Sequence, residues 1–194
     1  MVYLAVQHLA SQLGQFLRRR HGLIEDIVVA SGLVQPDGSP VPQAQNKLVL
    51  VLANIEKDTM PRSASPASGE FDGRIALRAA PLHLNLHILL AANFGAGSYA
   101  EALKFLSSAI SYFQRTAVFD HLSSHDLPKG IERLVLDIEN MRLQELSNLW
   151  STLGAKHVPS ILYKVRMVTI GGDDLSGLAP SISMPRPAVG AEFA

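Results

Sequence analysis

The feature that most constrains the fold of this chain is residues 47–55, KLVLVLANI, where Leu, Val and Ile hold most positions. The apolar residues follow one another without polar alternation, a pattern typical of a strand that is buried on both faces. With 194 residues and 47% hydrophobic content, the chain is long enough for one domain with a real core and short for two. We therefore expect a single domain with this strand in its core.

Other runs have the length or the period-two alternation of strands. They are residues 27–30, a short run beginning at Ile75, and residues 82–88, 131–140 and 161–170. In residues 82–88, Leu and Ile alternate with His83, Asn85 and His87, which predicts one buried face and one semi-polar face.

Three helices are predicted from apolar residues that recur every three or four positions. The first ends in RRRHG (18–22), where cations in the last turn and a following glycine suit a helix C-terminus. The second spans residues 99–114 behind Ser98 and Glu101, which have the spacing of a capping box. The third carries Trp150 and ends at Gly154.

The order of these elements predicts an α+β fold with a mixed, mostly antiparallel β-sheet packed with about three helices. We place this domain at residues 1–170. Residues 59–73 are rich in Pro, Ser, Ala and Gly, which predicts a long exposed loop. Residues 171–194 have the same bias without periodicity, which predicts a flexible C-terminal tail.

Charge and cysteine content exclude several functions. Lys plus Arg and Asp plus Glu number 17 each, so no overall field draws the chain to nucleic acid or to an anionic membrane. The absence of cysteine excludes disulfides, a thiolate nucleophile and cysteine-ligated metals, and it fits a cytoplasmic protein. We expect no export signal at the N-terminus, and the apolar residues near 82–94 are too interrupted for a membrane span.

A glycine-rich motif raises one alternative function. Residues 95–100, GAGSYA, stand between a predicted strand and a predicted helix, and Asp120 follows at about the twenty-residue spacing of a dinucleotide fingerprint. In that interpretation Gly95, Gly97 and Asp120 bind the cofactor. The remaining sequence lacks the repeated strand–helix units of a nucleotide-binding half, so a plain turn into a capped helix is favoured.

Other candidate chemistry is weak. His121 and His125 have a spacing that chelates a metal on a helix, but their surroundings predict a polar loop. His83 and His87 lie on one strand about 13 Å apart, which is too far to share an ion. No nucleophile elbow, Walker loop or HExxH motif is present, so we predict no catalytic residue, metal or cofactor. The run of three arginines at 18–20 indicates a helix end that is exposed to solvent.

A set of short segments is specific in its order and spacing, although each segment alone is mostly a core pattern. The segments are IED (24–26), NK (46–47) with LANIE (52–56), PLHLNLHIL (81–89), YAEALKFL (99–106), FQ (113–114) with VF (118–119), LSNLW (146–150) with LGAK (153–156), PS (159–160) and YKVRM (163–167). With this set the chain resembles, up to about residue 170, the N-terminal domain of the cap or tail-terminator proteins of extracellular contractile injection systems.

Two departures accompany this resemblance. His83 and His87 stand where the family leads us to expect aromatic residues such as Tyr. The chain also stops soon after the domain, where longer relatives carry a further C-terminal part, so it is open whether a second cap protein is needed.

The resemblance implies a phage-tail-like, virion-like structural role. It implies a ring of identical subunits, expected to be a homohexamer, that binds inner tube and sheath subunits at the distal end and stops elongation. Such a protein would be cytoplasmic during assembly and then part of a released or cell-associated particle. The resemblance carries over no catalytic residue. The alternatives are a nucleotide-binding protein or enzyme using the Gly95 loop, and a generic ring-forming adaptor.

The two segments that the fold does not need are the predicted contact regions, because segments of this composition commonly become ordered on a partner. We expect subunit or tail contacts from Arg62 and Phe71 in the loop, and from Ile182, Met184 and Phe193 in the tail.

Overall fold

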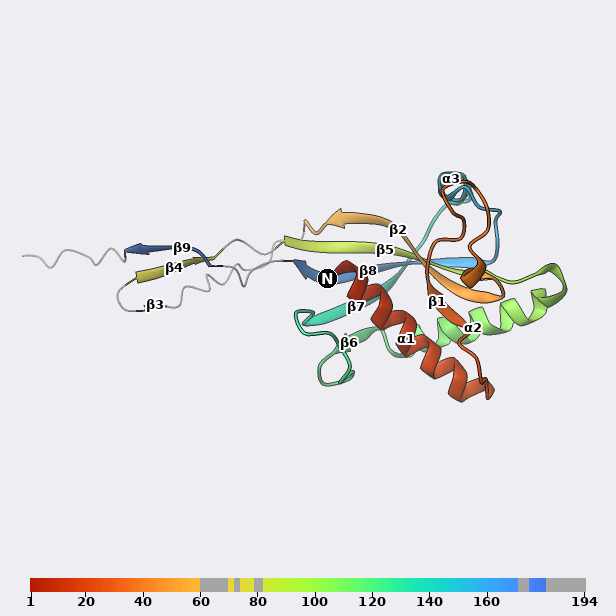
Figure 1. The fold of residues 1–194 in the computed structure, drawn as a ribbon, viewed down its shortest axis with the longest axis horizontal. Coiled ribbons are helices and arrows are strands. Elements are labelled where there is room, and N and C mark those ends of the chain that lie inside the picture. Colours follow the sequence, from red (N-terminus) through yellow and green to blue (C-terminus); the bar gives the residue numbers. More distant parts are fainter. Residues whose placement is uncertain (60–69, 72–73, 79–81, 171–174, 181–194) are drawn as a thin grey trace, which may run out of the picture. The chain divides into compact units, whose positions relative to one another are not determined.

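The computed structural model describes residues 1–59, 70–71, 74–78, 82–170 and 175–180 (Figure 1). Its residues divide into two compact units. The larger unit comprises Met1–Thr59 and His83–Ile170, and the smaller comprises Met60–Leu82 and Gly171–Ala194.

A six-stranded sheet forms the larger unit, with the strand order β1-β2-β5-β8-β7-β6. The strands are β1 (Val28–Ala30), β2 (Lys47–Lys57), β5 (Leu82–Asn93), β6 (Val118–Asp120), β7 (Arg133–Glu139) and β8 (Ser160–Ile170). β1 is parallel to β2, whereas the pairs β2–β5, β6–β7 and β7–β8 are antiparallel. The predicted α+β class and mixed, mostly antiparallel sheet are confirmed.

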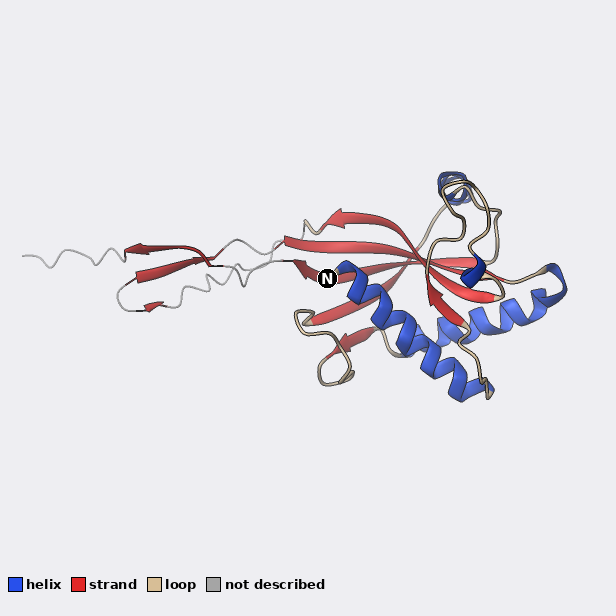
Figure 2. Ribbon diagram, viewed as in Figure 1, coloured by secondary structure: helices blue, strands red, loops and turns tan. Residues whose placement is uncertain are grey.

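Three α-helices cover this sheet (Figure 2). α1 (Val2–His21) and α2 (Tyr99–Arg115) lie on one face, and α3 (Leu143–Leu153) lies on the other. Two single turns of 3-10 helix, η1 (Pro42–Ala44) and η2 (Ala96–Ser98), precede β2 and α2. The three predicted helices are therefore confirmed.

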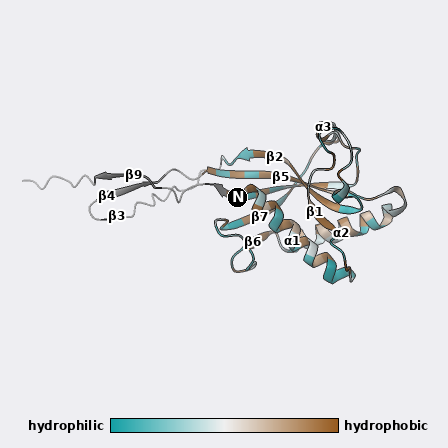
Figure 3. Ribbon diagram, in the orientation of Figure 1, coloured by the Kyte–Doolittle hydropathy of each residue, from teal (hydrophilic) through white to brown (hydrophobic). Residues whose placement is uncertain are grey.

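The core has two layers because β2 and β5 contribute apolar side chains to both faces of the sheet (Figure 3). Leu50, Leu90 and their neighbours pack under α1 and α2, while Val51 and Leu89 pack under α3 with Trp150. Burial of both faces, predicted for residues 47–55, holds only for residues 48–51. Leu52 and Ile55 are 37% and 44% exposed, since β1 pairs only with Leu48–Leu50 and does not cover the outer edge of this half of β2.

The sequence predicts that only one face of β5 is buried, but the semi-polar face is buried as well. Asn85 and His87 are only 6% and 9% exposed. β5 lies between β2 and β8 at the centre of the sheet, so long side chains of both neighbours flank its polar positions. The strand also continues to Asn93, beyond the predicted residue 88.

Glycines end two of the helices as predicted. Gly22 and Gly154 adopt the left-handed conformation, with φ of 63° and 66°, and this conformation favours glycine. The predicted capping box at Ser98 is not formed, because Ser98 is the last residue of η2 and its side chain makes no capping hydrogen bond. Half of a capping box begins α3, where Arg142 N–H donates to Glu145 Oε2 at 2.8 Å, and the donor-only side chain of Arg142 does not complete it.

The smaller unit contains a three-stranded antiparallel sheet of order β3-β4-β9. Its strands are β3 (Glu70–Phe71), β4 (Arg74–Arg78) and β9 (Leu175–Pro180). β3 falls in the predicted loop 59–73 and β9 falls in the predicted tail 171–194. The other residues of these two segments lie outside the described part of the chain, except for Thr59.

The core assignment predicts a large stability loss for Leu90→Ala. Leu90 is fully buried between β2 and β8, so the truncation removes apolar contacts and leaves a cavity. We expect the free energy of unfolding to fall by about 2–5 kcal/mol. Urea denaturation followed by the fluorescence of Trp150, the single tryptophan, measures it. Leu122→Ala is the matched control, because Leu122 is 90% exposed. Equal losses in the two variants would contradict the assignment.

Candidate interface surfaces

Most of the predicted contact residues cannot be placed on a surface. Arg62, Ile182, Met184 and Phe193 lie outside the described residues, and Phe71 is the second residue of β3. Their role in contacts stays a prediction. The described surface of the larger unit nevertheless has features suited to binding another chain.

The first feature is the outer edge of β2. β1 pairs only with Leu48–Leu50, and the last bond between them is Ser31 N–H to Leu50 O at 3.2 Å. β2 continues for seven residues, to Lys57, and no described strand pairs with its outer edge there. Unpaired N–H and C=O groups on such an edge are a template for another strand.

The opposite edge of the sheet is closed by a turn. Asp120, the last residue of β6, donates its backbone N–H to Ser123 Oγ at 3.1 Å, and its carbonyl oxygen accepts Ser124 N–H at 2.8 Å. The Asp120 carboxylate also accepts the backbone N–H groups of Leu122 and Ser123, and the bonds from Ser123 are the main cause that lowers the pKa of this carboxyl. The edge of β6 therefore offers few free backbone groups.

An apolar groove of about 550 Å³ runs beside the open edge of β2. It lies between the first turns of α1, the end of β1 and the middle of β2, and its lining residues are Val2, Tyr3, Val6, Gln7, Ala30, Ser31, Gly32, Leu50, Val51 and Leu52. The start of α1 lies toward the same end of the sheet as the end of β2 (Figure 1). Tyr3 is 70% exposed at its rim. An apolar side chain of a partner would fit this surface.

The second feature is a row of charges on the α3 face of the sheet, beyond the reach of α3. Glu56 Oε2 lies 3.1 Å from His87 Nε2 and 3.6 Å from Lys164 Nζ. On the same strand as Lys164, Arg166 forms an ion pair with Asp137 of β7. The row crosses β2, β5, β8 and β7, because residues opposite one another on neighbouring strands share a face.

Glu56 contacts two members of this row, His87 and Lys164. Contact with the His87 ring is the largest cause that holds the pKa of Glu56 below its ordinary value, and Lys164 adds to the effect. Among the described residues, the buried Asn85 Oδ1, two positions before His87, has no hydrogen-bond partner. The His87 ring is held by its contact with Glu56, and Asn85 Oδ1 is a buried polar atom of this face.

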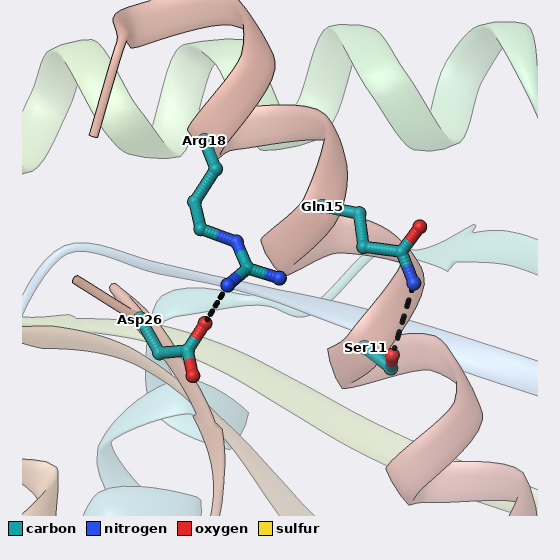
Figure 4. Close-up of polar contacts among 4 residues, drawn as sticks. All are labelled: Ser11, Gln15, Arg18 and Asp26. Carbon is teal, nitrogen blue, oxygen red and sulfur yellow. Dashed lines mark hydrogen bonds and ion pairs between the residues drawn. The ribbon is translucent and has the colours of Figure 1, made fainter. Parts of the chain in front are cut away.

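The arginines at the end of α1 contact groups of the same chain (Figure 4). Arg18 Nη1 lies 3.0 Å from Asp26 Oδ1, and one turn earlier the side-chain amide of Gln15 donates to Ser11 Oγ at 3.4 Å. The Arg20 guanidinium lies 5.9 Å from the centre of the Phe16 ring. The predicted solvated helix end therefore also anchors the connection from α1 to β1.

The glycine motif does not adopt the dinucleotide-binding arrangement. Gly95 follows β5, and β8 begins beside that end, where Ala92 N–H donates to Pro159 O at 2.9 Å. Asp120 pairs with Arg133 at the start of β7, whereas the end of β7 lies beside the start of β8. Gly95 and Asp120 thus lie at opposite ends of the sheet, about 20 Å apart along a seven-residue strand. A fingerprint requires the two groups at one end.

Histidines and buried tyrosine support the fold. In the described part of the chain, His121 and His125 belong to no group of three or more potential metal ligands. His8 of α1 contacts Ser124 Oγ at 3.0 Å, and burial lowers the pKa of His8 despite the opposing charge of Asp126. The sequence has no signal for this contact because the two residues are 116 positions apart. Burial raises the pKa of Tyr163 to about 12, so its hydroxyl stays protonated.

The fold is that of an α+β domain whose sheet has an open edge along β2. A protein-family model described as the Pvc16 N-terminal domain matches residues 5–183, and the chain belongs to this family. The searched helices of the described residues include none that combines the length and apolarity needed to cross a bilayer. No curated protein sequence matches the chain.

Two solved structures are similar in fold. The sheath/tube terminator of an extracellular contractile injection system, PVC, in its extended state has 19% identity and a TM-score of 0.67 over 100% of this chain. The tube-terminating cap of the anti-feeding prophage, AFP, has 18% identity and a TM-score of 0.57 over 92% of this chain. The chain spans 65% and 59% of the lengths of these two proteins.

The position of Gly97 generates a test of the glycine motif. A Cβ at Gly97 would meet no atom within 4 Å and its φ is not positive, so Gly97→Ala should leave stability unchanged or raise it by about 0.4–1 kcal/mol. Gly154→Ala is the control, and at its φ of +66° we expect a loss of about 1 kcal/mol or more. Urea denaturation followed by circular dichroism measures both. Saturable NAD or ATP binding that Gly97→Ala abolished would contradict our interpretation.

The charge row generates a test by pH. Because the pKa of Glu56 is lowered in the folded state, its contact with His87 stabilises the fold above the ordinary carboxyl pKa, and this contribution is lost as pH falls through the lowered value. In His87→Phe we expect the pKa of Glu56 to rise toward its ordinary value, measured by carboxyl ¹³C NMR titration. The pKa of Asp120 should stay unchanged, since its partner is Ser123. An unmoved Glu56 would refute this assignment.

Proposed function

We propose that the chain is a structural terminator subunit of a contractile injection system. In this role it forms a ring on the distal end of the inner tube and sheath and stops their elongation. The observation that carries the proposal is the fold shared with a sheath/tube terminator and a tube-terminating cap, together with the family match over residues 5–183. The subunit acts without catalysis, during assembly in the cytoplasm and afterwards as part of the particle.

The larger unit has a physical basis for ring formation. A closed ring arises when one surface of a subunit binds a different surface of the next and the rotation closes. The open half of β2 and the groove beside it form such a one-sided surface, because the other edge of the sheet is closed by the Asp120 turn. We expect six subunits, to match a hexameric tube.

The charge row supports the contact with tube or sheath. Glu56, Lys164, Asp137 and Arg166 present both signs on one face, so a partner must match them in register. Charges arranged in this way select a partner and an orientation more than they raise affinity. A terminator needs this selectivity, because it must bind the end of an assembled tube and leave free subunits alone.

The two alternatives have different standing. The nucleotide-binding alternative has no support from the geometry, because Gly95 and Asp120 lie at opposite ends of the sheet. A generic ring-forming adaptor would show the same self-association but would not affect tube length. The tube-length experiment therefore separates the adaptor from the terminator.

The proposal is tested with co-expressed tube and sheath subunits. Electron micrographs of particles made with the chain should show tubes of uniform length with a cap at one end, and omission of the chain should give tubes of uncontrolled length. Static light scattering of the purified chain, alone and with tube subunits, should show self-association at micromolar concentration. A strict monomer in both samples, or unchanged tube lengths, would overturn the proposal.

A further inference from the structure

The open edge of β2 has a limited length. It begins after Leu50, where β1 ends, and the charged residues Glu56 and Lys57 occupy its far end. Charged residues at an edge hinder the pairing of another strand. The part suited to pairing is therefore residues 51–55, which contain the register shift between Leu52 and Asn54.

The two sides of this edge differ in polarity. Leu52 lies opposite Ile88 and faces α1, where it lines the apolar groove with Tyr3 and Val6. Asn54 lies opposite His87 and faces the charge row on the other side. A strand added here would need apolar residues at alternate positions, facing α1, and small polar residues between them.

The C-terminal tail contains one segment with this pattern. Residues 181–184, SISM, alternate Ser with Ile182 and Met184, and the segment lies between Pro180 and Pro185. Proline limits a strand because it lacks the N–H group that the ladder needs. Ile182 and Met184 stand two positions apart and match Leu52 and Ile55, the two apolar residues of the open edge that face α1 on either side of the register shift at residues 53–54.

We propose that residues 181–184 of a neighbouring copy pair as a strand with residues 52–55 of β2, with Ile182 and Met184 in the groove beside α1. This inference rests on the proposed ring and specifies one contact within it. The contact joins different surfaces of two subunits, the tail of one and the edge of the next, and such contacts propagate around a ring until it closes. It also covers the exposed apolar side chains of Leu52 and Tyr3.

The absence of cysteine from the chain allows a direct test by disulfide cross-linking. Asn54 is exposed and faces away from the groove, and Ser183 would face the same side in the added strand. Neighbouring strands bring such pairs within the Cα separation of about 4.4–6.8 Å that a disulfide requires. We would mix full-length Asn54→Cys and Ser183→Cys chains, oxidise them mildly, and identify the linked peptides by mass spectrometry.

A disulfide between positions 54 and 183 of the two variants is expected, and it can form only between copies. Adding Ile182→Glu and Met184→Glu to the tail variant should reduce this product by about tenfold or more, because two charges would enter an apolar groove. Ser181→Glu is the matched control on the outward side and should reduce it much less. Circular dichroism checks that each variant is folded.

The outcomes separate the inference from the proposed function. If the chain forms rings and limits tube length but the 54–183 product is absent, the tail contact is wrong and the terminator function stands. A double variant, Asn54→Cys with Ser183→Cys, that links only within one chain would overturn the neighbouring copy as the donor. If neither rings nor the product forms, both are overturned.

Discussion

The antiparallel pairing of β2 with β5 is the interaction on which the larger unit depends. Its register runs from Lys47 opposite Asn93 to Lys57 opposite Leu84, and it brings the two most apolar runs of the chain side by side. In the first half of the pair, side chains on both faces are buried, so α1 and α2 pack on one face and α3 on the other. Burial of this pair provides much of the hydrophobic free energy of the fold.

The second half of the same pair has a different character. A register shift between Leu52 and Asn54 marks the change, and beyond it the α3 face becomes polar. Glu56, His87 and Lys164 form their contacts there, and the outer edge of β2 has lost its β1 partner. One pair of strands thus combines a buried core with a surface that is suited to recognition.

Two buried titratable groups of the larger unit serve packing. Burial lowers the pKa of His8 and raises the pKa of Tyr163, so both groups hold neutral forms that suit packing. The terminator and cap structures that share the fold are longer than this chain.

The sequence by itself determined the elements and the fold class, because hydrophobic period and terminal glycines are local properties of the chain. The three helices, the stops at Gly22 and Gly154, and the strands around residues 50, 86, 136 and 165 followed from it. Only the tertiary structure decided that Asn85 and His87 are buried, that Leu52 is exposed, and that Ser98 makes no cap. Period shows which side chains share a face, but burial depends on which strands flank them and where the covering helices end.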